Sequence, residues 1–183
     1  ALLTAAVCFA PNSVSAQKGG NKKPQPDLSL HQEMFKNLIA PYKGKVIYVD
    51  FWGTWCPGCI QEFSYMKKIK EDLAGEDITY MYFASNSPED QWEKDIRKHN
   101  LIGDNVVHYR LPKYQHQMLD KLFNIQRYPR YLIVDRDGNV VDKEAPRPSS
   151  GKKTVAALKV WLDKEASAVA TETAGEKPEL SDN

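Results

Sequence analysis

Cys56 and Cys59 lie three residues apart and are the residues of this chain best suited to chemistry. Pro57 and Gly58 separate them, and an apolar run over 46–52 precedes them. That run predicts a strand and the residues after Cys59 predict a helix, so we expect Cys56 at a helix N-terminus, whose unpaired N–H groups favour thiolate over thiol. Because the thiolate is the species that attacks disulfides, the pair predicts thiol–disulfide exchange.

Other uses of the two cysteines fit the sequence less well. A structural disulfide closing so small a loop would restrict the unfolded chain little. A zinc site would need two further ligands, and a c-type haem attachment would need His where Ile60 stands. We therefore expect neither metal nor cofactor, with a structural or metal-binding pair as the alternative. The four histidines, none of which has a partner at ligand spacing, are His31, His99, His108 and His116.

Length and charge exclude some classes of protein. The chain of 183 residues is long enough for one domain with a hydrophobic core and tails. It carries 25 Lys and Arg residues against 24 Asp and Glu residues, a formal net charge of +1. This balance gives no electrostatic reason to expect a nucleic-acid partner.

The first sixteen residues carry no charge and close with small residues up to Ala16. They resemble the end of a secretory signal peptide, so we expect residues 1–16 to be removed and the protein to be exported, for example to the periplasm. An uncleaved membrane anchor is the alternative. A lipid on Cys8 is disfavoured because Val7, and not a small residue, precedes it. After cleavage, the mature chain would keep only the two cysteines of the pair.

Strand and helix patterns alternate over residues 28–165, between a Gly/Pro/Lys-rich linker at 17–27 and a tail at 166–183 that we expect to be disordered. Ser87 and Pro88 predict a helix start, with Ser87 as N-cap. Asp137 and Gly138 predict the turn of a β-hairpin. The expected elements are a helix within 28–40, a strand over 44–52, a helix from 59 to 75, a strand over 78–83, a helix over 88–100, a strand over 106–111, a helix over 115–123, hairpin strands at 131–134 and 140–141, and a helix over 154–162.

This order predicts an α/β fold with a mixed sheet covered by helices on both faces. In such folds, chemistry lies at the loops that follow the carboxyl ends of the strands. The loop that carries the two cysteines follows the first predicted strand in this way. The sequence therefore places the reactive pair where the fold class places active sites.

The stretch 49–59, VDFWGTWCPGC, resembles the active-site strand and motif of the thioredoxin-like superfamily, and within it the exported thiol:disulfide oxidoreductases of the TlpA/ResA type. Glu62 is similar to the glutamate at the start of the helix in the cytochrome-maturation reductases. Tyr128 and Pro129 stand where the family carries its cis-proline. The resemblance covers about 28–164. It implies a thioredoxin-like fold, disulfide-containing substrate proteins and a membrane-linked thiol donor.

The chain departs from this family at three points. Gly58 precedes the second cysteine where many members have Pro, and Tyr128 precedes the cis-proline position where Thr is common. The strand over 78–83 has no counterpart of the lysine found in cytosolic thioredoxins. These differences leave the reaction type intact and leave the redox potential and the preferred partner open.

Four residues are expected to carry the reaction. Cys56 is the expected attacking thiol and Cys59 the resolving thiol, with a Cys56–Cys59 disulfide as the oxidised state. Asp50 lies in an apolar strand, where burial would raise its pKa and suit it to accept the proton of Cys59. The resemblance assigns a similar proton-handling role to Glu62. The alternatives are a partly exposed acid at Asp50 and a solvated surface acid at Glu62.

The substrate-binding surface is expected around the cysteine loop. Trp55 would flank the thiols as a contact surface, with core packing as its alternative, and Pro57 and Gly58 complete the loop. Pro129, if cis as the resemblance implies, would expose the backbone of Tyr128 for strand-like hydrogen bonds to an incoming chain. An ordinary trans peptide is the alternative.

The sequence thus favours a thiol:disulfide oxidoreductase, and the resemblance favours reduction over oxidation of exported targets. Two other functions stay open. One is a non-catalytic thioredoxin-fold binding module or metallochaperone. The other is a thiol peroxidase, which is less favoured because Thr54 stands two residues before Cys56, where the peroxiredoxin pattern has three.

Overall fold

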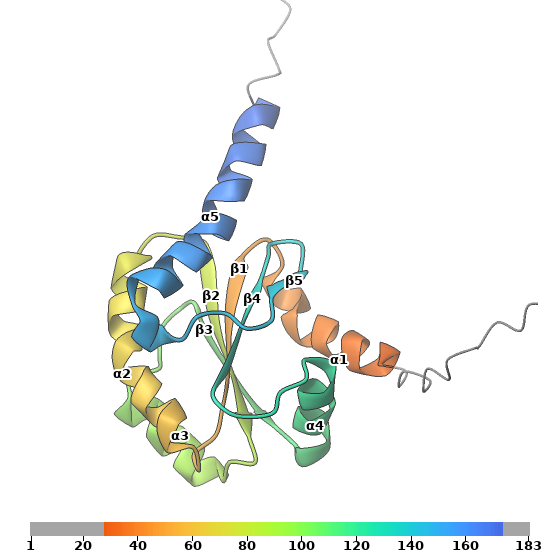
Figure 1. Ribbon diagram of the computed structural model, residues 1–183, viewed down its shortest axis with the longest axis vertical. Coiled ribbons are helices and arrows are strands. Elements are labelled where there is room, and N and C mark those ends of the chain that lie inside the picture. The colour runs from red at the N-terminus through yellow and green to blue at the C-terminus, as the bar shows by residue number, and fades with distance from the viewer. Residues whose placement is uncertain (1–27, 174–183) are drawn as a thin grey trace, which may run out of the picture.

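The computed structural model of the protein describes residues 28–173, with side chains up to Lys164. A five-stranded sheet of order β3-β2-β1-β4-β5 runs through its centre, with helices on both faces (Figure 1). The expected signal peptide, Cys8 and the linker lie outside the described residues. The elements are α1 (Ser29–Ile39), η1 (Ala40–Tyr42), β1 (Val46–Trp52), α2 (Pro57–Asp72), β2 (Ile78–Ser85), α3 (Glu89–Lys98), β3 (Val106–Leu111), α4 (Lys113–Leu122), β4 (Arg130–Val134), β5 (Val140–Asp142), η2 (Pro148–Ser150) and α5 (Lys152–Thr173).

The predicted mixed sheet is confirmed. β1 pairs in parallel with β2 and antiparallel with β4, and every residue of β1 and β2 is buried. Strands covered on both faces read as continuous apolar runs, which is why 46–52 and 78–83 could be recognised. The hairpin of β4 and β5 is antiparallel, as the turn at Asp137 and Gly138 predicts.

Alternation along β1 divides the core into two layers, because successive side chains of a strand point to opposite faces. Tyr48 and Trp52 belong to the layer under α2 and α5, whereas Val49 and Phe51 belong to the layer with α1 and α4. Asp50 lies between Tyr48 and Trp52 in this alternation. Its side chain therefore faces the α2 layer, which also contains Cys59.

Two predicted boundaries are wrong. Ser87 does not cap α3: the N-cap residue is Pro88, without a side-chain hydrogen bond, because the Ser87 hydroxyl is used elsewhere, as described below. The last helix does not end at 162, because α5 continues to Thr173 and so includes the start of the segment expected to be disordered. The sequence after Lys164 is rich in Ala, the strongest helix former. The rest of that tail, from 174 on, lies outside the described residues.

Within residues 28–173, no helix combines the length and the apolar character that a membrane span requires.

Candidate active site

The loop between β1 and α2 presents Cys56 as the N-cap residue of α2. The backbone N–H of Cys59 donates to Cys56 Sγ over 3.2 Å, and the two cysteines form a disulfide with their Cα atoms 5.3 Å apart. Pro57 occupies the first helical position, where its missing N–H costs no hydrogen bond. A helix-start amide is thus directed at Cys56 Sγ, as a thiolate at this position requires.

The two cysteines differ slightly in exposure. Cys59 is fully buried, whereas Cys56 keeps 6% of its surface exposed. Packing of the loop within the layer under α2 and α5 covers most of Cys56. The difference between the two cysteines has the expected direction, because only Cys56 meets solvent.

Gly53 allows the loop to close tightly over β2. A Cβ atom at this position would lie 2.5 Å from Trp55 Nε1, closer than real contacts allow, and 3.0 Å from the carbonyl oxygen of Ser85, which is unusually tight. The Trp55 indole uses this space and donates from Nε1 to Ser85 O over 2.9 Å. Half of the Trp55 side chain stays exposed, so the residue is a surface group and not a core residue.

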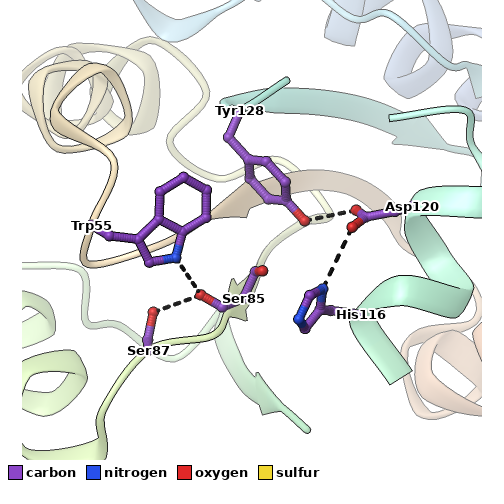
Figure 2. A network of polar contacts seen from close by, with 6 residues as sticks. All are labelled: Trp55, Ser85, Ser87, His116, Asp120 and Tyr128. Atoms are coloured by element: carbon purple, nitrogen blue, oxygen red, sulfur yellow. Dashed lines mark hydrogen bonds and ion pairs between the residues drawn. The ribbon is translucent and has the colours of Figure 1, made fainter. Parts of the chain in front are cut away.

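Ser87 ties the cysteine loop to the end of β2. Its hydroxyl accepts the N–H of Thr54 over 3.0 Å and donates to Ser85 O over 3.0 Å, the same carbonyl that accepts the Trp55 indole (Figure 2). The residue expected to cap α3 therefore fixes the backbone that precedes Trp55.

Tyr128 stands opposite Trp55 and is anchored from α4. The two rings meet edge to face with centroids 5.5 Å apart. The Tyr128 hydroxyl donates to Asp120 Oδ1 over 2.7 Å, and Asp120 Oδ2 lies 3.5 Å from His116 Nδ1 (Figure 2). Burial and the charge of Asp120 raise the pKa of Tyr128, so this hydroxyl stays protonated and keeps its role as donor.

The Tyr128–Pro129 peptide is cis, as the resemblance implies. Pro129 is buried against the cysteine loop: a Cβ atom at Gly58 would lie 3.7 Å from Pro129 Cδ. Pro57 and Gly58 are exposed. The residues expected to bind substrate are thus gathered around the disulfide, namely Trp55, Pro57, Gly58, Tyr128 and Pro129.

Asp50 is the buried acid of β1, on the side of the strand that faces the α2 layer. It is 2% exposed, and neither carboxylate oxygen meets a donor in hydrogen-bond geometry within the described residues. Burial raises its pKa well above the ordinary range, and the charge of Glu62 adds to this effect. The nearby Tyr131 hydroxyl lowers the pKa only in part. A buried carboxyl without a full set of donors favours its protonated form.

Glu62 lies on α2 and is buried, so the alternative of a solvated surface acid does not apply. Ser149 holds both of its oxygens: the backbone N–H donates to Oε2 and the hydroxyl donates to Oε1, each over 2.8 Å. Ser149 belongs to η2, which packs between α2 and the start of α5. The contact fixes one carboxylate near Asp50 while Asp50 itself lacks comparable donors.

Tyrosines surround the Asp50 carboxyl. Tyr48 and Tyr131 stack with centroids 5.4 Å apart, and the Tyr48 hydroxyl donates to Pro146 O over 2.6 Å. Burial raises the pKa of Tyr48, Tyr82 and Tyr131, and the charge of Asp50 raises each of them further. None of these phenols ionises near neutral pH, so Asp50 is the group of this cluster that is suited to exchange a proton.

The four histidines lie apart from one another in the contacts that they make. No group of three or more His, Cys, Asp or Glu side chains with metal-binding geometry occurs among the described residues. His108 instead stacks on Tyr82 and lies 2.7 Å from Leu101 O, and burial lowers its pKa.

Sequence reasoning missed five residues that shape the site, because their contacts join positions far apart in the chain. No local pattern distinguishes them from ordinary surface polar residues. The one available signal is the N-cap motif at Ser87. It correctly indicates that the Ser87 hydroxyl is hydrogen-bonded, but it predicts the wrong partner. The missed residues are Ser85, Ser87, His116, Asp120 and Ser149.

Comparisons with known proteins agree with this geometry. The Redoxin family model matches residues 18–159. The protein is 26% identical over 114 residues to the thiol-disulfide oxidoreductase ResA of Geobacillus kaustophilus, which covers 62% of this chain and 60% of that protein. It is 26% identical over 135 residues to the thioredoxin-like protein YneN of Bacillus subtilis, covering 73% and 75%. The chain thus spans under two thirds of the length of the ResA relative.

Solved structures resemble it as well. A Bacteroides vulgatus protein assigned as a thiol-disulfide oxidoreductase has 30% identity and a TM-score of 0.54, covering 67% of this chain and 79% of that one. The thioredoxin domain of another Bacteroides vulgatus thiol-disulfide oxidoreductase has 23% identity and a TM-score of 0.58, covering 68% and 84%. The expected thioredoxin-like fold is therefore confirmed.

Proposed function

Because the chain belongs to the Redoxin family, with the thioredoxin-like fold of the TlpA/ResA type, we propose that it is a thiol:disulfide oxidoreductase whose Cys56 and Cys59 alternate between dithiol and disulfide. The observation that carries the proposal is the helix-start amide of Cys59 directed at the Sγ atom of Cys56, the more exposed of the two cysteines. Such an amide stabilises a negative sulfur, which makes Cys56 the attacking thiolate.

The reaction proceeds in two exchanges. The Cys56 thiolate attacks one sulfur of a substrate disulfide, which forms a mixed disulfide and releases the other substrate sulfur as a thiolate. Cys59 then loses its proton and attacks Cys56 Sγ, which closes the Cys56–Cys59 disulfide and releases the second substrate thiolate. Two electrons pass to the substrate, and its two thiolates take up protons. Exchange with a thiol donor restores the dithiol.

Asp50 accepts the Cys59 proton in the second exchange when it is in its carboxylate form, which its raised pKa makes a stronger base than an ordinary carboxylate. The raised pKa of Asp50 lies closer to the pKa of a thiol than that of an ordinary carboxyl does. Proton transfer from Cys59 to Asp50 therefore costs less free energy than transfer to an ordinary carboxylate. Glu62 keeps negative charge near Asp50 and so supports its high proton affinity. Asp50 and Cys59 both belong to the buried layer under α2, which supports this pairing.

The direction, partners and location form a further part of the proposal. We assign reduction of disulfides in exported proteins, with a membrane-linked thiol donor, on the strength of the resemblance to ResA. An exported location would follow from the signal-like residues 1–16, and cytochrome maturation is one process that such a reductase serves. Potentials of Cys-x-x-Cys pairs run from about −270 to −120 mV, roughly 7 kcal/mol for two electrons. Equilibration of the dithiol with glutathione measures its reduction potential and so tests the direction. A potential of about −120 mV would contradict the assignment of the protein as a reductant.

Trapping tests the assignment of the two thiols. Cys56→Ser should abolish reduction of insulin disulfides, and Cys59→Ser should accumulate mixed disulfides visible on non-reducing gels. Ser64→Ala, an exposed position on α2, is the control and should behave as the wild type. Mixed disulfides formed only by Cys56→Ser would reverse the roles. Absence of exchange together with stoichiometric metal on the dithiol would show a binding module instead.

A further inference from the structure

A hollow lined by arginines opens beside Pro129. Its volume is about 400 Å³, and its lining includes Arg127, Arg130 and Arg147. Only one acidic residue, Glu144, takes part in the lining. Since the whole chain carries a formal charge of only +1, this concentration of positive charge is a local feature.

One arginine of the hollow is fixed and two are available. Arg130 is largely buried, and its Nη1 donates to Glu144 Oε1 over 2.6 Å and to Lys143 O over 3.2 Å. The guanidinium groups of Arg127 and Arg147 meet no acceptor among the described residues, and both residues are exposed. The hollow therefore holds two positive charges that no acid of the described chain neutralises.

The chain places this charge next to the disulfide. Arg127 and Arg130 directly flank Tyr128 and Pro129, and Pro129 in turn lies against Gly58 of the cysteine loop. A polypeptide that pairs with the Tyr128 backbone would run past both arginines. Alternate side chains of an extended segment point to opposite sides, so one set would face the hollow.

We propose that this hollow is a specificity subsite for an acidic side chain close to the target disulfide of a substrate polypeptide. The proposal rests on the oxidoreductase function above and adds a substrate class to it. Guanidinium groups bind carboxylates through paired hydrogen bonds, so Arg127 and Arg147 supply the recognition while Arg130 shapes the wall. Positive charge around the site also speeds the encounter with an acidic partner.

Paired peptides test the subsite. Two disulfide-bridged peptides would differ only in having Asp and Glu, or Asn and Gln, beside the disulfide. We expect the reduced wild-type protein to favour the acidic peptide about 5- to 10-fold in kcat/KM at low ionic strength, the range of a rim-charge effect on association. Salt at 0.5 M should remove most of this preference, because screening shortens the reach of charges to a few ångströms.

Variants locate the preference. The double variant Arg127→Ala with Arg147→Ala should lose it, and Arg127→Glu with Arg147→Glu should reverse it in favour of the neutral peptide. Arg97→Ala is the matched control, since Arg97 lies on α3 in an exposed pair with Glu93, outside the hollow. It should keep the wild-type ratio.

The outcomes separate the two proposals. Equal rates for both peptides in the wild type, or a preference that survives in both double variants, would overturn the subsite and leave the oxidoreductase function standing. Failure of the reduced wild-type protein to reduce either peptide, or even the uncharged 2-hydroxyethyl disulfide, would overturn the oxidoreductase function, and the subsite with it.

Discussion

The two sides of the disulfide loop differ in how their polar groups are satisfied. On the outer side, the Trp55 indole and the Tyr128 hydroxyl each donate to a defined acceptor, and Ser87 supplies a further link. On the inner side, the Asp50 oxygens and the Tyr82 hydroxyl lie buried without a partner in hydrogen-bond geometry in the part of the chain that the structure describes. We call these the outer platform (Trp55, Ser85, Ser87, Asp120, Tyr128) and the inner cluster (Asp50, Tyr48, Tyr82, Tyr131).

The contrast separates two tasks. A hydrogen-bonded surface keeps its shape, so the outer platform suits repeated docking of polypeptides. Burial without donors disfavours the carboxylate form of an acid and raises its pKa. The inner cluster therefore suits proton exchange. Changes to the inner cluster should therefore alter rates and pH dependence, whereas changes to the outer platform should alter binding.

The largest expected effect comes from the inner cluster. Asp50→Asn should slow the second exchange about 100-fold, because it removes the proton acceptor for Cys59, and should leave the first exchange much less affected. Rapid-quench measurements of mixed-disulfide formation and decay separate the two steps. Asp120→Asn, an equivalent change on the outer platform, is the matched control. Wild-type rates for both steps in Asp50→Asn would remove Asp50 from the mechanism.

Stability should also depend on pH through Asp50. Its folded pKa is raised, so the folded state keeps a proton that the unfolded state loses above about pH 3.9. Stability therefore falls as pH rises from that value to the raised pKa. Asp50→Asn should remove this decline and raise the free energy of unfolding at pH 8 by about 1–3 kcal/mol, the usual cost of an unsatisfied buried group. Urea unfolding of the oxidised wild type and the oxidised variant between pH 4 and 9 measures this free energy. Parallel dependences on pH for the two proteins would contradict the prediction.

Ser149→Ala should have a smaller effect, because it removes one of the two hydrogen bonds to Glu62 and keeps the backbone donor. We expect a loss of about 1–2 kcal/mol in the free energy of unfolding, near the lower end for bonds to charged groups. The neighbouring Ser150→Ala, which leaves Glu62 untouched, is the control. Equal stabilities of the two variants would show that the hydroxyl does not hold the carboxylate.

The smallest effect is expected on the outer platform. Tyr128→Phe keeps the ring against Trp55 and removes the bond to the Asp120 carboxylate. Such a bond contributes about 1.5–3 kcal/mol, but only a fraction of it acts on substrate binding, so KM for a protein substrate should rise about two- to threefold with kcat unchanged. Tyr65→Phe, on the exposed side of α2, is the control. A loss of kcat instead of a rise in KM would contradict the assignment of binding to the outer platform and of rate to the inner cluster.

Local patterns predict part of the site well. The strand, the cysteine loop and the helix start lie within 46–59, where burial, spacing and helix capping act over a few residues. The burial of Asp50 could be predicted by the same means, because the strand that contains it is apolar on both sides and is buried throughout. These features depend on residues that are neighbours in the sequence, and a single sequence shows such neighbours directly.

Long-range hydrogen bonds could not be predicted. Ser149 reaches Glu62 across 87 positions, and Trp55 reaches Ser85 across 30. The error at Ser87 has the same origin: a serine before Pro88 is a good cap by local rules, yet the packed loop offers its hydroxyl a closer partner in Thr54. Tertiary packing decides which of several backbone groups a short polar side chain bonds.

The position of Trp55 provides an optical readout. Its indole directly precedes the disulfide in the chain and is held in place by one hydrogen bond, and disulfides quench indole fluorescence at short range. Opening of the disulfide should therefore brighten this residue. Its half-exposed ring should also emit at longer wavelength than the fully buried Trp52. Emission from the unlabelled protein can thus follow each turnover in real time.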